Sequence, residues 1–427
     1  MTLTWSQRVA QRYQVRLPPD VVRWFDDERW TLPGGGEFNQ PLAPDQLLDP
    51  EPGLIWPGFM LPDTLPLIGN QYGDWLCLRI DAASGVGECL YWSHAGGDWL
   101  PSGRTLSESL VYDALRGRET GGRTPGGNWS DTAIATQEGW ATHVAWAWEQ
   151  LAADADLLAL LKPRPTEALR GELGRRGWSR WALARDAVIA CLDCALRSRS
   201  DYRTAQRMGV PWEPDYVQWM FDTDLIPAAR RRQLLELFGS GDVELLGQDW
   251  TGAEKLAVET AQERPDMGWA YDVAGWAAER RGDVAAAVTR YAAGIRPSLF
   301  ADHTVAFRTH WIADGFAKFS AARLYELRAN VPRSVSDDPY VRLYWEQAPA
   351  TLRERVSAFW LEAARDSERR GAWAEAYESY YRAGWDLGLD SLSGFVEILE
   401  GLERAASAQG AQGLAVVAAL HRRLLPG

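Results

Sequence analysis

Apolar and polar positions alternate most clearly between Leu67 and Trp99, in the run LIGNQYGDWLCLRI, DAASGVGE, CLYWSHAGGDW. In Trp75–Ile80 the odd-numbered side chains would face one side of a strand and the even-numbered ones the other. A Gly-rich turn at residues 84–87 separates this run from a second strand-like run that starts at Cys89. The pattern predicts two adjacent antiparallel strands at the centre of a small α+β domain.

Helices are expected on both sides of the strand pair. Residues 4–16 can form a short helix, and Leu17–Phe25 (LPPDVVRWF) opens a second one, because proline in the first turn removes amides that have no partner there. Residues 31–66 are rich in Pro and Gly and predict ordered loop. The segment SGRTLSESLVYDAL, which ends at Leu115, predicts a helix that closes the domain.

The composition changes after residue 115. Residues 116–130 contain five glycines and one proline and predict a linker between residues 1–115 and 131–427, although a long loop inside one domain would read the same way. From residue 131 onward, apolar residues recur with a period of 3.6 in Ala/Leu/Arg/Glu-rich segments. This part of the chain is predicted to be all-α.

The helical part contains an internal repeat. ERRGDVAAAVTRY at Glu279–Tyr291 matches ERRGAWAEAYESY at Glu368–Tyr380, with an offset of 89 residues. Each copy predicts two helices joined by a Gly turn, within residues 267–297 and 356–386. A helix pair of this kind cannot bury its apolar face alone, so we expect it to stack on further helices.

The charge is acidic and unevenly spread. The 427 residues carry a net charge of −13, and residues 1–115 hold 15 acidic against 7 basic residues, a net charge of −8. This balance argues against a nucleic-acid partner, which requires a basic surface. It favours the approach of a basic protein, or it serves only to keep the protein in solution.

Other composition features point to an ordinary cytoplasmic protein. The N-terminal residues lack the apolar core of a signal peptide, and no apolar run is long enough to span a membrane, so we expect no membrane partner. The four cysteines are expected to be reduced thiols. The 23 tryptophans are scattered along the chain, which favours packing in the core over a sugar-binding platform.

His94 is the strongest candidate for chemistry. It lies in YWSHAGGDW, where Asp98, Glu88 or Asp74 would be its acid–base partner. No nucleophile motif accompanies it, so hydrogen bonds from the ring to the nearby backbone or to Asp98 explain this histidine better than catalysis does.

Three other motifs are weaker. Cys191 and Cys194 have a metal-like CxxC spacing inside a predicted helix, but tetrahedral zinc needs two more ligands. His303 and His310 lack a carboxylate or Cys partner at helical spacing. The Gly34–Gly36 run is not followed by the Lys-Ser/Thr of a phosphate-binding loop. We therefore expect no metal, no cofactor and no catalytic residues.

The repeat resembles the tetratricopeptide repeat family in its Gly-x-x-x-x-Ala-x-x-x-Tyr core. Gly275, seven residues before Gly282, fits the same pattern, and Ala364 stands at the matching place in the second copy. The offset of 89 is not a multiple of the family period of roughly 34 residues, so the array would be irregular. The resemblance implies a protein-binding scaffold.

The first 115 residues resemble the SUKH superfamily, which includes the fungal Smi/Knr cell-wall regulators. The matching runs follow in order: Leu17–Phe25, Leu67–Ile80, Gly87–Trp99 and the closing helix. The resemblance implies an α+β sheet domain used as a binding module. Many bacterial members are immunity proteins that neutralise toxins made by neighbouring genes.

The hypothesis that follows is a cytoplasmic, non-enzymatic protein-binding protein, immunity or regulatory in role, that recognises a partner stoichiometrically. A basic toxin or regulatory protein would be such a partner. The alternative is a hydrolase of glycans or nucleotides that uses carboxylates and His94. The residues expected to contact a partner are aromatic or acidic or are His94 itself: Tyr72, Asp74, Trp92, His94, Asp98 and Trp99.

Overall fold

The computed structural model describes residues 2–32, 37–70, 72–119, 137–151, 167–192, 248–302, 304–305, 316–346 and 348–426. By its internal contacts the chain forms two compact units, described separately below. The first comprises Met1–Leu183 and Val356–Gly427, and the second comprises Ala184–Arg355. The first unit thus joins the N-terminal residues to the last helices of the chain, a different division from one at residues 116–130. Most of that expected linker lies outside the described residues.

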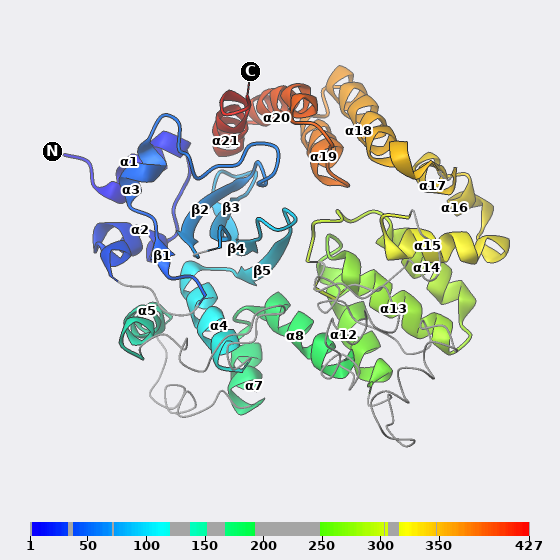
Figure 1. The fold of residues 1–427 in the computed structure, drawn as a ribbon, viewed down its shortest axis with the longest axis horizontal. Coiled ribbons are helices and arrows are strands. Elements are labelled where there is room, and N and C mark those ends of the chain that lie inside the picture. The colour runs from blue at the N-terminus through cyan, green and yellow to red at the C-terminus, as the bar shows by residue number, and fades with distance from the viewer. Residues whose placement is uncertain are drawn as a thin grey trace, which may run out of the picture. The chain divides into compact units, whose positions relative to one another are not determined.

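The first unit contains a five-stranded antiparallel sheet in the order β1-β2-β3-β4-β5 (Figure 1). The strands are β1 Gln40–Pro41, β2 Thr64–Gly69, β3 Trp75–Ile80, β4 Val86–Trp92 and β5 Trp99–Gly103. The sheet and the many helices confirm the α+β class. The predicted β3–β4 hairpin is also confirmed, but the run Leu67–Ile80 is not one strand, because β2 ends at Gly69 and β3 begins only at Trp75.

Side chains of β3 alternate between the two faces of the sheet, as predicted. Leu76, Leu78 and Ile80 belong to the core cluster that also contains residues of the N-terminal helices. Arg79 lies on the other face, where its guanidinium group pairs with Asp63. Five consecutive residue pairs of β3 and β4, from Trp75–Trp92 to Arg79–Glu88, keep one antiparallel register.

N-terminal helices line the face of the sheet that carries the core cluster. Thr4 caps the first helix by accepting a hydrogen bond from the Gln7 amide. Pro19 starts the second helix, and no backbone partner is lost there. These two helices are α1 Trp5–Tyr13 and α2 Pro19–Asp26. The other helical segments of this part are η1 Arg29–Thr31, α3 Pro44–Leu48, α4 Leu106–Glu119, α5 Gln137–Gln150, α7 Glu167–Arg176 and α8 Arg180–Leu192, which runs on into the second unit.

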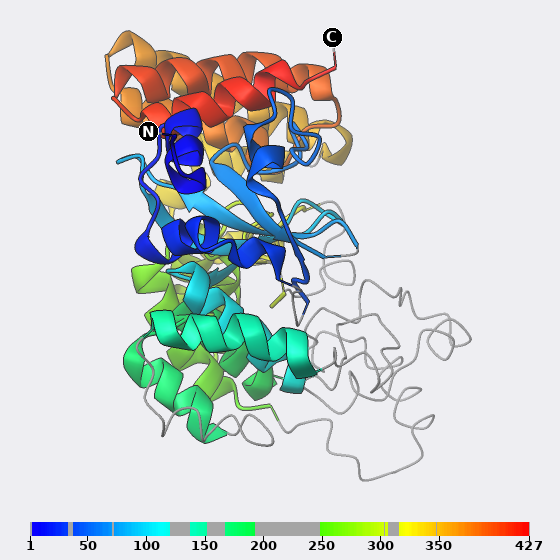
Figure 2. The same ribbon diagram turned by 90° about the vertical axis from the view of Figure 1, so that its left-hand side faces the viewer.

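The C-terminal helices complete the first unit by packing on the N-terminal part. In Figure 2 the red helices lie against the blue N-terminal helices and strands. A Cβ atom at Gly413 would lie 2.8 Å from Val15 and 3.3 Å from Ile80, so the backbone of the last helix touches the core directly. These helical segments are α18 Leu352–Arg369, which begins in the second unit, α19 Trp373–Trp385, η7 Leu392–Gly394, α20 Phe395–Ala408 and α21 Gln412–Arg423.

Every secondary-structure element described in the second unit is a helix, and loops and turns join these helices. Its core is made mainly by α12, α13, α14 and α15. Its segments are α12 Trp250–Glu263, α13 Gly268–Arg280, α14 Val284–Gly294, α15 Phe319–Glu326, η5 Arg328–Asn330, α16 Arg333–Ser336, α17 Pro339–Trp345 and η6 Pro349–Thr351.

The two copies of the sequence repeat share a side-chain arrangement. In the second unit, the Tyr291 hydroxyl donates to Glu279, and Arg323 from the next helix donates to the same carboxylate. In the first unit, Arg404 donates to Glu368 at 3.2 Å and to the hydroxyl of Tyr380 at 3.3 Å. Each copy therefore ties its second helix to a third helix through a Tyr, a Glu and an Arg.

Among the described residues, no helix is both long and apolar enough to cross a membrane.

Candidate functional site

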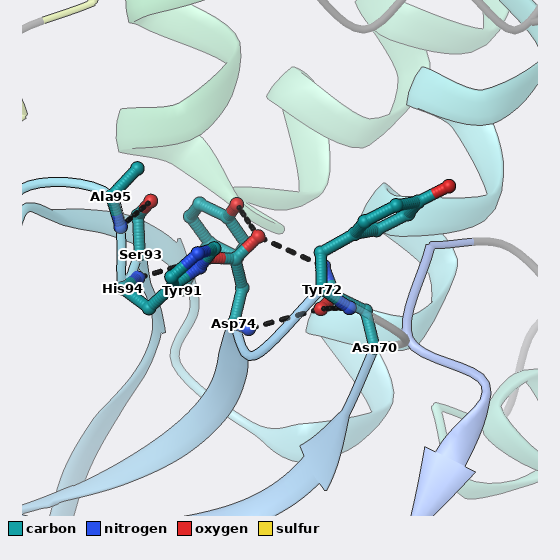
Figure 3. A network of polar contacts seen from close by, with 7 residues as sticks. All are labelled: Asn70, Tyr72, Asp74, Tyr91, Ser93, His94 and Ala95. Carbon is teal, nitrogen blue, oxygen red and sulfur yellow. Dashed lines mark hydrogen bonds and ion pairs between the residues drawn. The ribbon is translucent and has the colours of Figure 1, made fainter. Parts of the chain in front are cut away.

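Two loops meet at one end of the β3–β4 hairpin. Asp74 precedes β3 and His94 follows β4, and the register pairs Trp75 with Trp92. The hairpin therefore brings residues that are 20 positions apart in sequence to the same place. Figure 3 shows the resulting polar network.

Asp74 is the centre of this network. Its Oδ2 accepts hydrogen bonds from Asn70 Nδ2 at 2.9 Å and from the Tyr91 hydroxyl at 2.7 Å. Its Oδ1 accepts from the His94 backbone amide at 2.9 Å and contacts His94 Nδ1 at 2.8 Å. Burial raises the pKa of this carboxyl, but hydrogen bonds from Asn70, His94 and Tyr91 outweigh the burial, so the net pKa of Asp74 is lowered. Asp74 is therefore held as a carboxylate that ties the two loops together.

Asn70 shapes the loop between β2 and β3. Its Oδ1 accepts from the amides of Tyr72 at 2.8 Å and Asp74 at 2.9 Å. Gly73 has a φ of +94°, which favours glycine, and a Cβ atom there would lie 3.4 Å from the His94 ring. This local geometry turns the Tyr72 side chain outward, where it is 56% exposed.

The expected partner contacts divide into surface and core residues. Tyr72 is exposed, the His94 side chain is 38% exposed and Asp98 is partly exposed. Asp74, Trp92 and Trp99 are only 7%, 0% and 3% exposed, so their side chains do not reach a partner. This corrects their expected role. Trp92 and Trp99 lie on the same face of the sheet as Arg79, and the Trp99 ring lies 4.7 Å from the Arg79 guanidinium.

Of the three acidic partners considered for His94, Asp74 contacts it. Glu88 instead pairs with Arg79 at 3.2 Å. Asp98 bends back over its own loop, and a Cβ atom at Gly96 would lie 2.6 Å from Asp98 Oδ2. The His94–Asp74 pair can orient an imidazole, but the other three bonds of Asp74 also give it a structural role.

Two exposed aromatic residues near His94 were missed by sequence reasoning. Trp56 is 42% exposed and Phe59 is 38% exposed, and the Trp56 ring lies 6.4 Å from the His94 ring. Both belong to the Pro/Gly-rich segment 31–66, in which no periodicity signals a surface role. The only available signal was two aromatic residues in a segment expected to be loop.

The weaker motifs give no additional site within the described residues. Cys191 is partly exposed and burial raises the pKa of its thiol, whereas Cys194, His303, His310 and Gly34–Gly36 lie outside the described residues. The described part of the chain has no cluster of three or more His, Cys, Asp or Glu side chains suited to a metal ion.

A surface cavity of about 640 Å³ lies away from His94. It is lined by residues of α20 and α21, among them Glu403, Arg404 and Arg422. The 2.9 Å ion pair between Arg422 and Glu403 accounts for part of its charge.

Comparisons of the chain with protein-family models, with curated proteins and with solved structures find no match.

Proposed function

We propose that the chain is a non-enzymatic protein-binding protein that recognises its partner stoichiometrically, in an immunity or regulatory role. The observation that carries this proposal is the exposed side chain of Tyr72 on a loop fixed by Asn70 and Asp74. A tyrosine presented in this way offers a large contact area and loses little conformational entropy on binding.

Charge and resemblance support the same function. The excess of acidic residues in positions 1–115 suits a basic partner. The likeness of this segment to SUKH domains, and of the helix pairs to tetratricopeptide repeats, implies binding surfaces. A toxin or regulatory protein with a basic surface fits these properties.

The first prediction concerns Tyr72. Immobilised full-length protein should capture a specific partner from a lysate of its source cells at moderate salt, and Tyr72→Ala should weaken that complex by about 30-fold, the loss of a typical interface hot spot of about 2 kcal/mol. Titration calorimetry with the identified partner measures the change. Leu3→Ala removes a side chain that is 49% exposed and serves as the control. Capture of no specific partner, or equal affinities for both variants, would contradict the proposal.

The second candidate function is hydrolysis of glycans or nucleotides. It rests on the 2.8 Å contact between His94 Nδ1 and Asp74 Oδ1, since a carboxylate can orient a histidine for acid–base chemistry. Turnover that is abolished by His94→Ala and retained by Tyr72→Ala would favour hydrolysis over binding.

A further inference from the structure

Four exposed apolar side chains form what we call the composite patch: Trp56, Phe59, Leu392 and Val396. They are 42%, 38%, 43% and 41% exposed. Only two other large hydrophobic side chains are comparably exposed among the described residues, and one of these, Tyr72, neighbours His94 through Gly73. Such a concentration of exposed apolar residues marks a contact surface.

The two halves of the patch come from distant parts of the first unit, and their segments meet at Gly58. Gly58 lies between Trp56 and Phe59 in sequence and has a φ of +77°. A Cβ atom at Gly58 would lie 2.8 Å from the Phe395 ring and 3.0 Å from Leu392 Cδ2, so the loop backbone touches the start of α20. Leu392 lies in η7 and Val396 in the first turn of α20, which follows η7 directly in the chain.

The aromatic half of the patch rests on the core. The rings of Trp56 and Phe59 are stacked with centroids 6.4 Å apart. Both make edge contacts with the buried Trp92, at 6.0 Å and 5.7 Å. The Met60 amide donates to the Trp56 carbonyl at 2.8 Å and closes the turn. The exposed rings are thus positioned before any partner arrives, which lowers the entropic cost of binding.

The segments that build the patch lack basic side chains almost entirely. No Lys or Arg occurs between Arg29 and Arg79, whereas six acidic residues do, and five acidic residues and no basic one lie between Arg382 and Arg404. Arg79 itself is neutralised by Asp63 at 2.8 Å and Glu88 at 3.2 Å. Glu397 is paired with Arg365, and Asp49, Glu51 and Asp390 are exposed.

We propose that the composite patch docks a basic protein partner, whose apolar side chains contact the four residues while its Lys and Arg side chains face the acidic surroundings. This inference rests on the proposed binding function and specifies its surface and its partner. A second copy of the chain would bring two acidic surfaces together, and anionic lipid would be repelled by the same charge. The C-terminal helices therefore supply half of the recognition surface.

The test uses the full chain and a defined probe. A labelled 14-residue peptide of Leu and Lys, with Leu at helical spacing, is titrated by fluorescence anisotropy, alongside a peptide with Glu in place of Lys. We expect binding of the Lys peptide only, with weakening as NaCl rises from 50 to 300 mM. The pair Leu392→Ser/Val396→Ser and the pair Trp56→Ser/Phe59→Ser should each weaken binding at least tenfold. Leu3→Ser, which replaces an exposed side chain outside the patch, is the matched control, and thermal melting measures whether each variant folds.

Several outcomes would overturn the assignment. They are equal affinity for the Glu peptide, affinity unchanged by both patch pairs, or a dimer of the wild-type chain that Leu392→Ser abolishes in sedimentation. If a native partner is captured and depends on Tyr72 but binds Leu392→Ser/Val396→Ser normally, the docking surface is wrong while the binding function stands. If the peptide results hold but no native partner exists, the patch stands as a basic-peptide site and the proposed function fails.

Discussion

The burial of His421 makes the folding stability of the protein depend on pH. It is 0% exposed on α21, and among the described residues neither ring nitrogen has a hydrogen-bond partner. Burial lowers the pKa of His421 from 6.5 to about 3. In the unfolded chain the imidazole of His421 is therefore protonated below about pH 6.5, whereas in the folded chain it stays neutral down to about pH 3. The folded state thus loses stability as the pH falls from 6.5 toward 3.

The prediction at this scale is a difference in pH dependence. Between pH 6 and pH 4.5, the free energy of unfolding of the wild type should fall by up to about 1.4 kcal/mol per pH unit more than that of His421→Leu. Carboxylates titrate in both proteins, so the comparison isolates the histidine. Urea unfolding of both proteins at a series of pH values gives the measurement, and parallel pH profiles would refute this account.

The amino-acid sequence predicted the network around His94 only in part. His94 could be singled out, but three carboxylates were equally plausible partners, because the choice of Asp74 depends on a turn between β2 and β3 that the sequence did not resolve. Likewise, Trp92 and Trp56 are the same residue type, but Trp92 lies in β4 and is buried, whereas Trp56 lies in the loop between α3 and β2 and is 42% exposed.

At the scale of elements, local patterns were predicted best. The alternation in Trp75–Ile80 and the Gly-rich turn predicted the central hairpin. The edge strands β1 and β5 were missed, since β1 has two residues and both contain a proline, which interrupts the apolar pattern and is tolerated at a sheet edge.

The close contact between α19 and α20 predicts that Gly401 cannot be replaced without loss of stability. A Cβ atom at Gly401 in α20 would overlap the Tyr380 ring. Gly401→Ala should therefore lower the free energy of unfolding by about 1–2 kcal/mol, because overpacking outweighs the gain of about 1 kcal/mol in helix propensity. Gly171→Ala in α7 is the matched control, since a Cβ atom there has no neighbour within 4 Å, and it should be neutral or stabilising. Urea unfolding measures the stability of both variants. A stabilising Gly401→Ala would show that the Tyr380 ring can move aside with no loss of stability.

At the scale of the whole molecule, composition predicted two kinds of structure but not which segments pack together. The linker-like residues 116–130 suggested that residues 1–115 fold apart from the rest. The core cluster of the sheet instead includes Leu414, Val417 and Leu420 from the last helix. A contact between residues some 400 positions apart depends on the path of the intervening chain, about which periodicity carries no information.

The last prediction follows from this shared core. Removing residues 356–427 deletes the side chains of Leu414, Val417 and Leu420, each 3% exposed or less, and exposes the core surface that they cover. At about 1.5–3 kcal/mol per buried side chain, the loss is about 5–9 kcal/mol, comparable with the whole stability of a typical domain. In the truncated chain we expect the backbone amides of β3, Trp75–Ile80, to lose most of their protection from hydrogen exchange, measured by mass spectrometry against the full chain. Unchanged protection in a soluble, monomeric truncated chain would show instead that the N-terminal α+β part folds independently, and that the C-terminal helices only add to a finished core.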